Sequence, residues 1–251
     1  MLTDRIAVVT GGAEGIGLEV CRQLANKFDT VFLTARDTET GEAAVEQLGL
    51  SNVVFFQLDL NDALSITHFA DFLQEWFGKV DILVNLDSIG AVEVTEAYEV
   101  AMEGLHTNYY GTKRVTEAFI PLLHSSSDGR IVIVSSGWLL LRIFNEELKR
   151  ELNDMENPTE ELVNESLTNF LGAEPRSWPT VFAAYTAAMN ACTRILARAH
   201  PDLRVNCVYP GYVYPGVLSP EEGAGNVTTV ALQPGGPTGQ YFALGKVTHF
   251  L

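Results

Sequence analysis

Basic residues are scarce in this chain: 16 lysines and arginines stand against 32 aspartates and glutamates, a formal net charge of −16. This balance argues against binding to nucleic acid or to an anionic membrane surface, because both require clustered cations. Cysteines are equally few. The three of them, Cys21, Cys192 and Cys207, lack CxxC spacing, so we interpret them as buried thiols of a reducing compartment. The five histidines show no metal-ligand spacing, and no metal site is predicted.

Long hydrophobic runs are also missing, and none approaches the length of a transmembrane helix. No signal peptide is expected, because the first predicted strand begins near Arg5. These features predict a cytoplasmic protein that acts on a small molecule. Apolar residues still make up 47% of the 251 residues, which is enough to bury a core. The length favours one substantial domain over two small ones.

A glycine-rich turn follows the first predicted strand, the apolar run at residues 6–9. Glycines recur in it as Gly-x-x-x-Gly-x-Gly, and apolar residues at helical spacing follow. A strand, a glycine turn and a helix together make a phosphate-binding site, because the backbone approaches the pyrophosphate closely and the helix N-terminus donates N–H groups. The alternative is that the glycines only allow close helix–strand packing. The predicted dinucleotide contacts are Gly11, Gly15, Ile16 and Gly17.

Strands and helices alternate along the chain, which predicts an α/β protein with a Rossmann-like, doubly wound parallel sheet in three layers. The alternation of strands and helices is interrupted at about 137–180, and we interpret this segment as an inserted helical lid within a single domain, 1–251. Strands are expected at 30–35, 53–58, 80–86, 130–135, 204–209 and 240–243, and helices at 38–48, from 61, at 95–104, 108–123, 146–155, 159–171, 181–200 and from 219.

The ends of the second and third predicted strands carry further candidate cofactor residues. Arg36 follows the second strand, where an arginine suits the 2′-phosphate of NADP(H). A solvated arginine paired with Asp37 explains that position equally well. Asp59 and Leu60 follow the third strand, at a place that commonly touches an adenine.

These motifs together resemble the short-chain dehydrogenase/reductase superfamily, and specifically its plant menthone reductase and salutaridine reductase branch, which includes animal carbonyl reductase. The resemblance runs essentially from end to end. It also covers the insertion, which in that branch forms a substrate lid over the surface that other members use to dimerise, so a monomer is expected. The motifs that carry it are residues 10–17, 33–37, 59–60, 107–112, 134–136, 184–185, 206–213 and 235–240.

The resemblance implies three catalytic residues, matched by motif: Asn108, Ser136 and Tyr185. The family's lysine, four positions after the tyrosine, is absent, and Met189 stands there. The family pattern resembles Tyr-x-x-Ser-Lys-Ala-Ala, so three residues look deleted. Either Tyr185 has moved relative to its helix, or the start of the helix has been rebuilt. The alternative is that Tyr185 only packs under the lid.

Three further departures lie where the cofactor would sit. The glycine turn has an acidic residue, Glu14, where this branch often has a lysine, and acid repels phosphate at close range. The family's Asn-Asn-Ala-Gly turn begins here at Asn85 and continues with a leucine and a carboxylate. The usual threonine after Pro210-Gly211 is missing. NADP(H) is therefore implied by the resemblance, but its binding is predicted to be weak or lost.

Three functions follow from this pattern. The preferred one is cofactor-independent isomerisation or cyclisation of an apolar, carbonyl-bearing small molecule, as in plant specialised metabolism, with Tyr185 and Ser136 polarising the carbonyl. The alternatives are an NADPH-dependent carbonyl or enone reductase with an atypical site, and a non-catalytic binding protein. An unassisted phenol stays protonated at neutral pH, so it acts as an acid and not as a base. The predicted substrate pocket comprises Trp138, Phe144, Trp178, Tyr212 and Tyr214.

Overall fold

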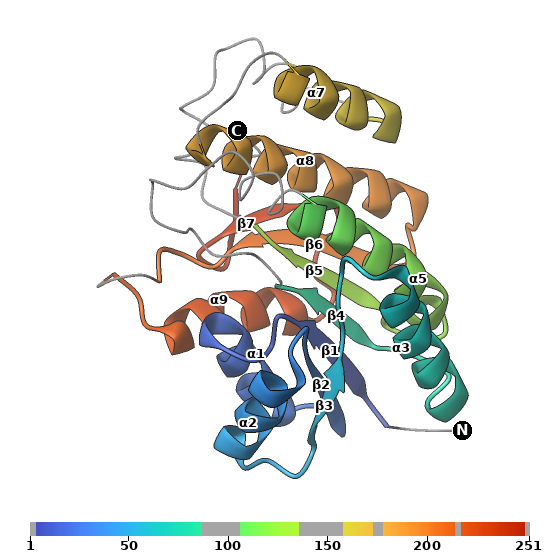
Figure 1. Cartoon of the computed structure of the whole chain (residues 1–251), viewed down its shortest axis with the longest axis vertical. Coiled ribbons are helices and arrows are strands. Elements are labelled where there is room, and N and C mark those ends of the chain that lie inside the picture. The colour runs from blue at the N-terminus through green and yellow to red at the C-terminus, as the bar shows by residue number, and fades with distance from the viewer. Residues whose placement is uncertain (1–3, 87–105, 136–157, 173–177, 214–216, 249–251) are drawn as a thin grey trace.

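The computed structural model describes residues 4–86, 106–135, 158–172, 178–213 and 217–248 (Figure 1). Strands and helices alternate through these residues, as predicted. In chain order the elements are β1 (Ile6–Thr10), α1 (Gly15–Ala25), β2 (Thr30–Ala35), α2 (Thr38–Leu48), β3 (Val53–Gln57), α3 (Ala63–Trp76), β4 (Ile82–Asn85), the π-helical turn η1 (His106–Gly111), α5 (Thr112–His124), β5 (Arg130–Val134), α7 (Glu160–Gly172), α8 (Trp178–Ala199), β6 (Arg204–Tyr209), α9 (Pro220–Leu232), β7 (Tyr241–Ala243) and β8 (Lys246–Thr248).

The strands form one sheet in the order β3-β2-β1-β4-β5-β6-β7-β8. All neighbouring pairs are parallel except β7 and β8, which form an antiparallel hairpin. From β1 the chain first winds outward to β2 and β3, and then returns to place β4 on the other side of β1. Ligands of such sheets bind at this reversal, beyond the carboxyl ends of β1 and β4. The predicted Rossmann-like, doubly wound sheet is confirmed.

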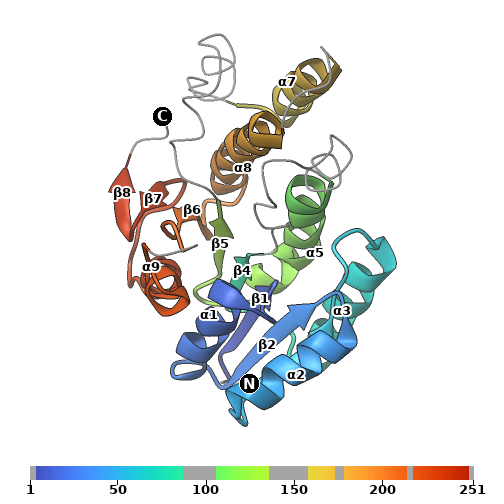
Figure 2. The ribbon, with the colours of Figure 1, turned by 60° about the vertical axis from the view of Figure 1, so that its left-hand side comes forward.

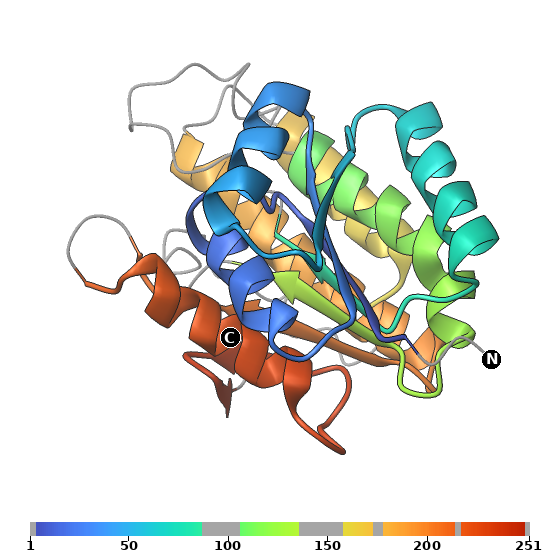
Figure 3. The ribbon, with the colours of Figure 1, turned by 90° about the horizontal axis from the view of Figure 1, so that it is seen from below.

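Each face of the sheet is covered by helices, which makes three layers (Figures 2 and 3). Helices α3, α5 and α8 cover one face, where residues such as Phe69 and Phe119 are fully buried. Helices α1, α2 and α9 cover the other face, with Leu24 and Val227 in its core. The strands contribute apolar side chains to both cores, which explains why they read as continuous apolar runs.

Helix α7 forms a further layer outside α8 (Figure 1). Two polar contacts fasten this end of the predicted lid. Lys113 of α5 forms an ion pair with Glu160, and the guanidinium of Arg198 donates a hydrogen bond to the carbonyl of Pro158. Much of the remainder of the predicted lid, at 137–157 and 173–177, lies outside the described residues. Its extent therefore stays a prediction, as does the single domain.

Some predicted boundaries shift for local reasons. The helix predicted at 108–123 begins only at Thr112, because the π-helical turn η1 comes first. The helix predicted from 61 begins at Ala63, since the Asp62 side chain accepts a hydrogen bond from the Leu64 N–H and caps it. Strand β8 was not predicted at all. The helices predicted at 95–104 and 146–155 fall outside the described residues.

The three cysteines are buried and unpaired with one another, which confirms their interpretation as thiols. Burial raises the pKa of Cys192 and of Cys207 to about 12, so neither forms a thiolate near neutral pH. Among the residues that the structure describes, no group of three metal-ligating side chains comes together. None of the helices described is both long and apolar enough to cross a membrane.

Candidate coenzyme and substrate site

The glycine turn after β1 requires glycine at several positions, some for their backbone conformation and some for lack of space. Gly11 and Gly15 have φ values of 61° and 53°, a conformation that L side chains rarely adopt. A Cβ on Gly17 would lie 2.0 Å from the carbonyl oxygen of Gly11, so any larger residue must displace the backbone. Helix α1 begins at Gly15, and the side chain of its N-cap residue Glu14 makes no capping hydrogen bond. The first amides of α1 are thereby left for an anion.

A cavity of about 640 Å³ opens in front of this turn, at the carboxyl ends of β1, β2 and β3. Five predicted cofactor residues line it: Gly11, Ile16, Arg36, Asp59 and Leu60. The other lining residues were not among the predicted contacts, although several lie within the same motifs and the sequence places Glu14 and the residue after Asn85 near the cofactor. These are Ala13, Glu14, Ala35, Asp37, Thr40, Asn61, Leu86 and Thr107.

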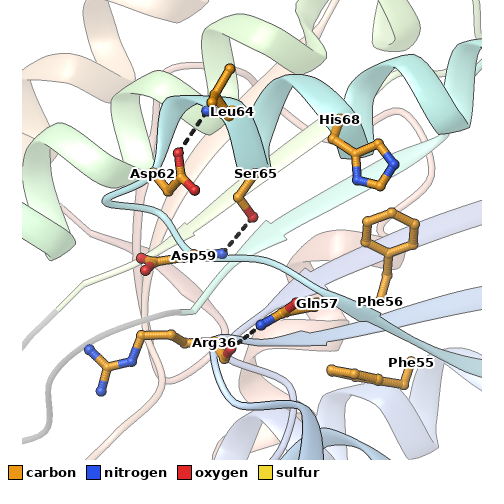
Figure 4. Close-up of a pocket in the computed structure, with 9 residues that line it drawn as sticks. All are labelled: Arg36, Phe55, Phe56, Gln57, Asp59, Asp62, Leu64, Ser65 and His68. Carbon is orange, nitrogen blue, oxygen red and sulfur yellow. Dashed lines mark hydrogen bonds between the residues drawn. The ribbon is translucent and has the colours of Figure 1, made fainter.

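Arg36 and Asp37 do not pair as the simpler interpretation required. The Asp37 carboxylate caps α2, accepting hydrogen bonds from the N–H and the hydroxyl of Thr40 at 2.8 and 2.6 Å. These bonds, and to a smaller extent the charge of Arg36, lower the pKa of Asp37. The Arg36 guanidinium makes no hydrogen bond or ion pair with any residue described. In Figure 4 the Arg36 side chain extends away from Phe55 and Phe56.

A second hollow of about 620 Å³ adjoins the first and shares Arg36 and Asp59 with it. Figure 4 shows the aromatic side chains of Phe55, Phe56 and His68 on one side of this hollow and Arg36 with Asp59 on the other. The Asp59 backbone N–H donates to the Ser65 hydroxyl at 3.0 Å, and the Asp59 carboxylate accepts from the Asn61 N–H at 2.9 Å. Both bonds fix the chain where it leaves β3.

The two predicted asparagines lie behind the cavity and do not line it. Asn85 is buried at the end of β4, where its side-chain N–H donates to the Thr116 hydroxyl at 2.9 Å. Asn108 is buried within η1, and π-helical turns of this kind are frequent at functional sites. The prediction that Asn85 contacts the cofactor stays a prediction, since the contact described for its side chain is with Thr116 of α5. Gly15 and Gly17 are not among the residues that line this cavity, and their predicted contacts stay predictions.

Helix α8 carries Tyr185 and continues without a break through Met189 to Ala199. Met189 is 2% exposed and lies in the apolar core, so the position four residues after the tyrosine faces packing, not a ligand. The side chains of Tyr185 and Trp178 are not described, and Ser136, Trp138, Phe144 and Tyr214 lie outside the described residues. Their predicted roles stay predictions.

The loop after β6 contacts helix α9 on one side and the β7–β8 hairpin on the other. Near the glycine turn, Val213 and Ile16 both contact Gly223 of α9. The Asn226 side chain holds the loop from below, donating to the Pro210 carbonyl at 2.8 Å. Tyr212, a predicted pocket residue, is 57% exposed in this loop and lies outside the 640 Å³ cavity.

Comparisons with known proteins identify this arrangement. The sequence profile of the short chain dehydrogenase family matches residues 5–143, more than half of the chain. The chain belongs to this family. It is 40% identical to the (+)-neomenthol dehydrogenase of Arabidopsis thaliana over 99% of both chains. It is 39% identical to the salutaridine reductase of Papaver somniferum, over 98% of this chain and 96% of that one.

More distant relatives and solved structures agree. The human carbonyl reductase [NADPH] 1 is 34% identical over 96% of this chain and 97% of its own. The solved menthone neomenthol reductase of Mentha piperita superposes with a TM-score of 0.85 at 35% identity, covering 96% of this chain and 99% of its own. The alignment with the Arabidopsis dehydrogenase spans 292 positions although this chain has 251 residues, so that relative has internal segments that this family member lacks.

These relatives overturn the preferred function. The prediction of a cofactor-independent isomerase or cyclase is wrong, because full-length relatives in this short-chain dehydrogenase family are named dehydrogenases and reductases. The predicted weakness or loss of cofactor binding finds no support among them either. That prediction gave more weight to side-chain changes than to the backbone of the glycine turn. Such turns bind phosphate through backbone N–H groups, and a Cβ on Gly17 would still lie 2.0 Å from the Gly11 carbonyl oxygen, as close backbone packing requires.

Proposed function

We propose that this protein is an NADPH-dependent oxidoreductase that reduces the carbonyl group, or the conjugated double bond, of an apolar ketone or enone. The observation that carries the proposal is the 640 Å³ cavity, which joins the glycine turn to the guanidinium of Arg36, a group that pairs with none of the residues the structure describes. The full-length similarity to named ketone and enone reductases supports the same reaction class.

The described residues fit the coenzyme. The backbone from Gly11 to Gly17 approaches closely enough for a pyrophosphate, and the first amides of α1 point their partial positive charge to it. Arg36 would hold the 2′-phosphate, because the competing carboxylate of Asp37 is engaged in capping α2. Asp59 and Leu60 would flank the adenine. When bound, NADPH supplies the hydride for the reduction.

The protein must then deliver one proton, so that a ketone becomes an alcohol or an enone becomes a saturated ketone. We assign this proton to the Tyr185 hydroxyl, with Ser136 donating a hydrogen bond to the substrate oxygen and Asn108 supporting the site from η1. A phenol without a neighbouring cation donates a proton more readily than it accepts one near pH 7. Since no lysine follows Tyr185 within the helix, we expect reduction to be faster than alcohol oxidation.

The substrate class follows from the apolar residues assigned to the pocket, namely Trp138, Phe144, Trp178, Tyr212 and Tyr214. The plant relatives favour a role in specialised metabolism.

We further expect a cytoplasmic monomer. The buried thiols suit a reducing compartment, and α7 occupies the outer face of α8. Light scattering of the purified protein tests the monomer, and a dimer would contradict it.

The test is consumption of NADPH in the presence of alkyl-substituted cyclohexanones and cyclohexenones, followed by absorbance and by product analysis. Wild-type protein is expected to form the alcohol or the saturated ketone only when NADPH is present. Tyr185→Phe should lower turnover at least about 100-fold while leaving the NADPH dissociation constant unchanged, because proton transfer contributes about 10²–10⁴-fold. Product formation without NADPH, or equal turnover by the variant, would contradict the proposal.

A further inference from the structure

The turn between β7 and β8 contains a residue in a strained conformation. Leu244 has a φ of 51°, and among the described residues it is the non-glycine residue with a positive φ. Its neighbour Gly245 has a φ of 73°, so the two residues form the kind of hairpin turn in which asparagine or glycine normally occupies the first position. A bulky side chain in this region is an outlier that points to a function.

The strained residue holds the loop that follows β6. One Leu244 methyl group lies 2.8 Å from the place where a Cβ on Gly211 would be, and a Leu218 methyl group lies 2.3 Å from it. Both leucines therefore pack directly over the Gly211 backbone, which has a φ of 103°. The Leu244 N–H also donates to the Tyr209 carbonyl at 3.1 Å. A side chain thus fastens the hairpin to the loop at the carboxyl end of β6.

The same place exposes apolar surface to water. Leu244 is 52% exposed, and Tyr212 and Val217 of the neighbouring loop are 57% and 68% exposed. This patch lies at the carboxyl ends of β6 and β7, the edge of the sheet where ligands bind. The loop reaches the coenzyme turn through the contact of Val213 and Ile16 with Gly223. Ile16 lines the proposed coenzyme cavity, so the Val213 end of this loop borders that cavity.

We propose that Leu244 is a specificity-determining residue, which together with Tyr212 and Val217 binds the hydrocarbon part of the substrate. The occupant is the alkyl portion of the ketone or enone, so the inference rests on the proposed function. A leucine in place of the usual asparagine or glycine is explained if its apolar side chain is needed at this position to contact the substrate. Each substrate methylene that is buried against these side chains should increase the affinity for the substrate about fourfold.

The test compares Leu244→Asn with Val247→Asn. Asparagine accepts a positive φ, so the first variant keeps the turn and replaces only the apolar side chain. Val247 is 54% exposed on the same hairpin but lines a different hollow beside α9, so it provides a matched control. The substrates are cyclohexanone and its derivative with a tert-butyl group opposite the carbonyl, which differ only in alkyl surface.

We expect Leu244→Asn to raise KM for the tert-butyl ketone at least about 10-fold, while KM for cyclohexanone changes less than about threefold. The NADPH dissociation constant and the unfolding temperature should not worsen, and Val247→Asn should resemble wild type in all four measurements. Equal changes for both ketones, or a lower unfolding temperature with unchanged KM values, would overturn the inference and leave Leu244 a structural residue.

The proposed function is judged separately, by the turnover of wild-type protein. If the wild type reduces neither ketone, the proposed function fails, and calorimetric binding of the tert-butyl ketone decides the inference alone. Weaker binding by Leu244→Asn than by Val247→Asn would support the apolar surface. Equal binding by the two variants, or none by any form of the protein, would overturn it.

Discussion

The two halves of the sheet build their parts of the site in different ways. In the half formed by β3, β2, β1 and β4, the cavity is shaped mainly by backbone, and most of its lining residues come from one continuous stretch, 11–61. In the half formed by β5, β6, β7 and β8, the surface comes from separate segments, such as the loop that follows β6 and the turn at Leu244. We therefore expect the glycine backbone to set whether a dinucleotide binds at all, Arg36 to set the preference for NADPH, and the separate segments of the second half to set substrate choice.

The largest expected effect on coenzyme affinity comes from adding a side chain to the glycine turn. Gly17→Val should raise the NADPH dissociation constant at least about 100-fold, because its Cβ would collide with the Gly11 carbonyl that shapes the phosphate turn. Calorimetry measures this change. Gly225→Ala is the control, since nothing lies within 4 Å of the added Cβ, and it should bind NADPH normally. Tight binding by Gly17→Val would show that the turn does not hold the coenzyme.

The next effect, on stability, tests whether position 189, where the family has its lysine, faces the core or the site. Met189→Lys should lower the free energy of unfolding by about 3 kcal/mol or more, because it buries an unpaired charge among apolar side chains. Met189→Leu keeps the volume and should cost less than about 1.5 kcal/mol. Urea unfolding followed by circular dichroism compares the two. If Met189→Lys were as stable as wild type and faster in turnover, position 189 would face the site instead of the core.

A smaller effect is expected from the acidic residue of the glycine turn. Glu14→Gln removes a negative charge from the cavity that receives the phosphates, so the affinity for NADPH should rise about threefold to tenfold at low salt. Glu46→Gln changes the net charge equally on the exposed surface of α2 and serves as the control. An equal gain in both variants would assign the effect to the overall charge of −16.

The smallest effect concerns acid stability, far from both halves of the site. His124 contacts Asp202 at 2.6 Å and His200 at 3.1 Å, which joins the end of α5 to the start of β6. Burial and then the neighbouring His124 lower the pKa of His200, and the hydrogen bond from His124 lowers the pKa of Asp202. A lowered pKa means that the unfolded chain binds the proton first as the pH falls.

Stability should therefore decline below the unfolded histidine pKa of about 6.5 through His200, and below about pH 4 through Asp202. His200→Gln should flatten the decline between pH 7 and pH 5, as measured by urea midpoints. His68→Gln, an exposed histidine of α3, should leave the slope unchanged. A slope that is the same in both variants and in wild type would exclude His200 as the cause.

The sequence predicts much of the coenzyme half because its signals are local. Apolar strands, the glycine spacing and Arg36 after β2 lie in consecutive β–α units, and the fold places them where the pattern requires. Thr107 was missed as a lining residue because η1 comes beside Asn61 only in three dimensions, where the Asn61 side chain donates to Thr107 at 2.8 Å. The same limit applies to Leu244, whose strain depends on a two-residue turn between very short strands.

The error about function has a physical cause as well. The substitutions at Glu14 and Met189 look severe in a linear sequence, because comparison with a motif treats all of its positions as equally important. In the structure, Met189 belongs to the core, and the cradle at Gly11–Gly17 depends on the backbone. Sequence similarity over the whole length to proteins named dehydrogenases and reductases supports the proposed reaction class better than any single motif residue does.

The most direct test of the central claim is a calorimetric titration of NADPH and of NADH into wild-type protein and Arg36→Ala. We predict that wild type binds NADPH in the micromolar range and at least about 10-fold more tightly than NADH, since a charge-assisted hydrogen bond contributes about 1.5–3 kcal/mol. Arg36→Ala should lose this preference and keep its affinity for NADH. Failure of wild type to bind either nucleotide would contradict the account.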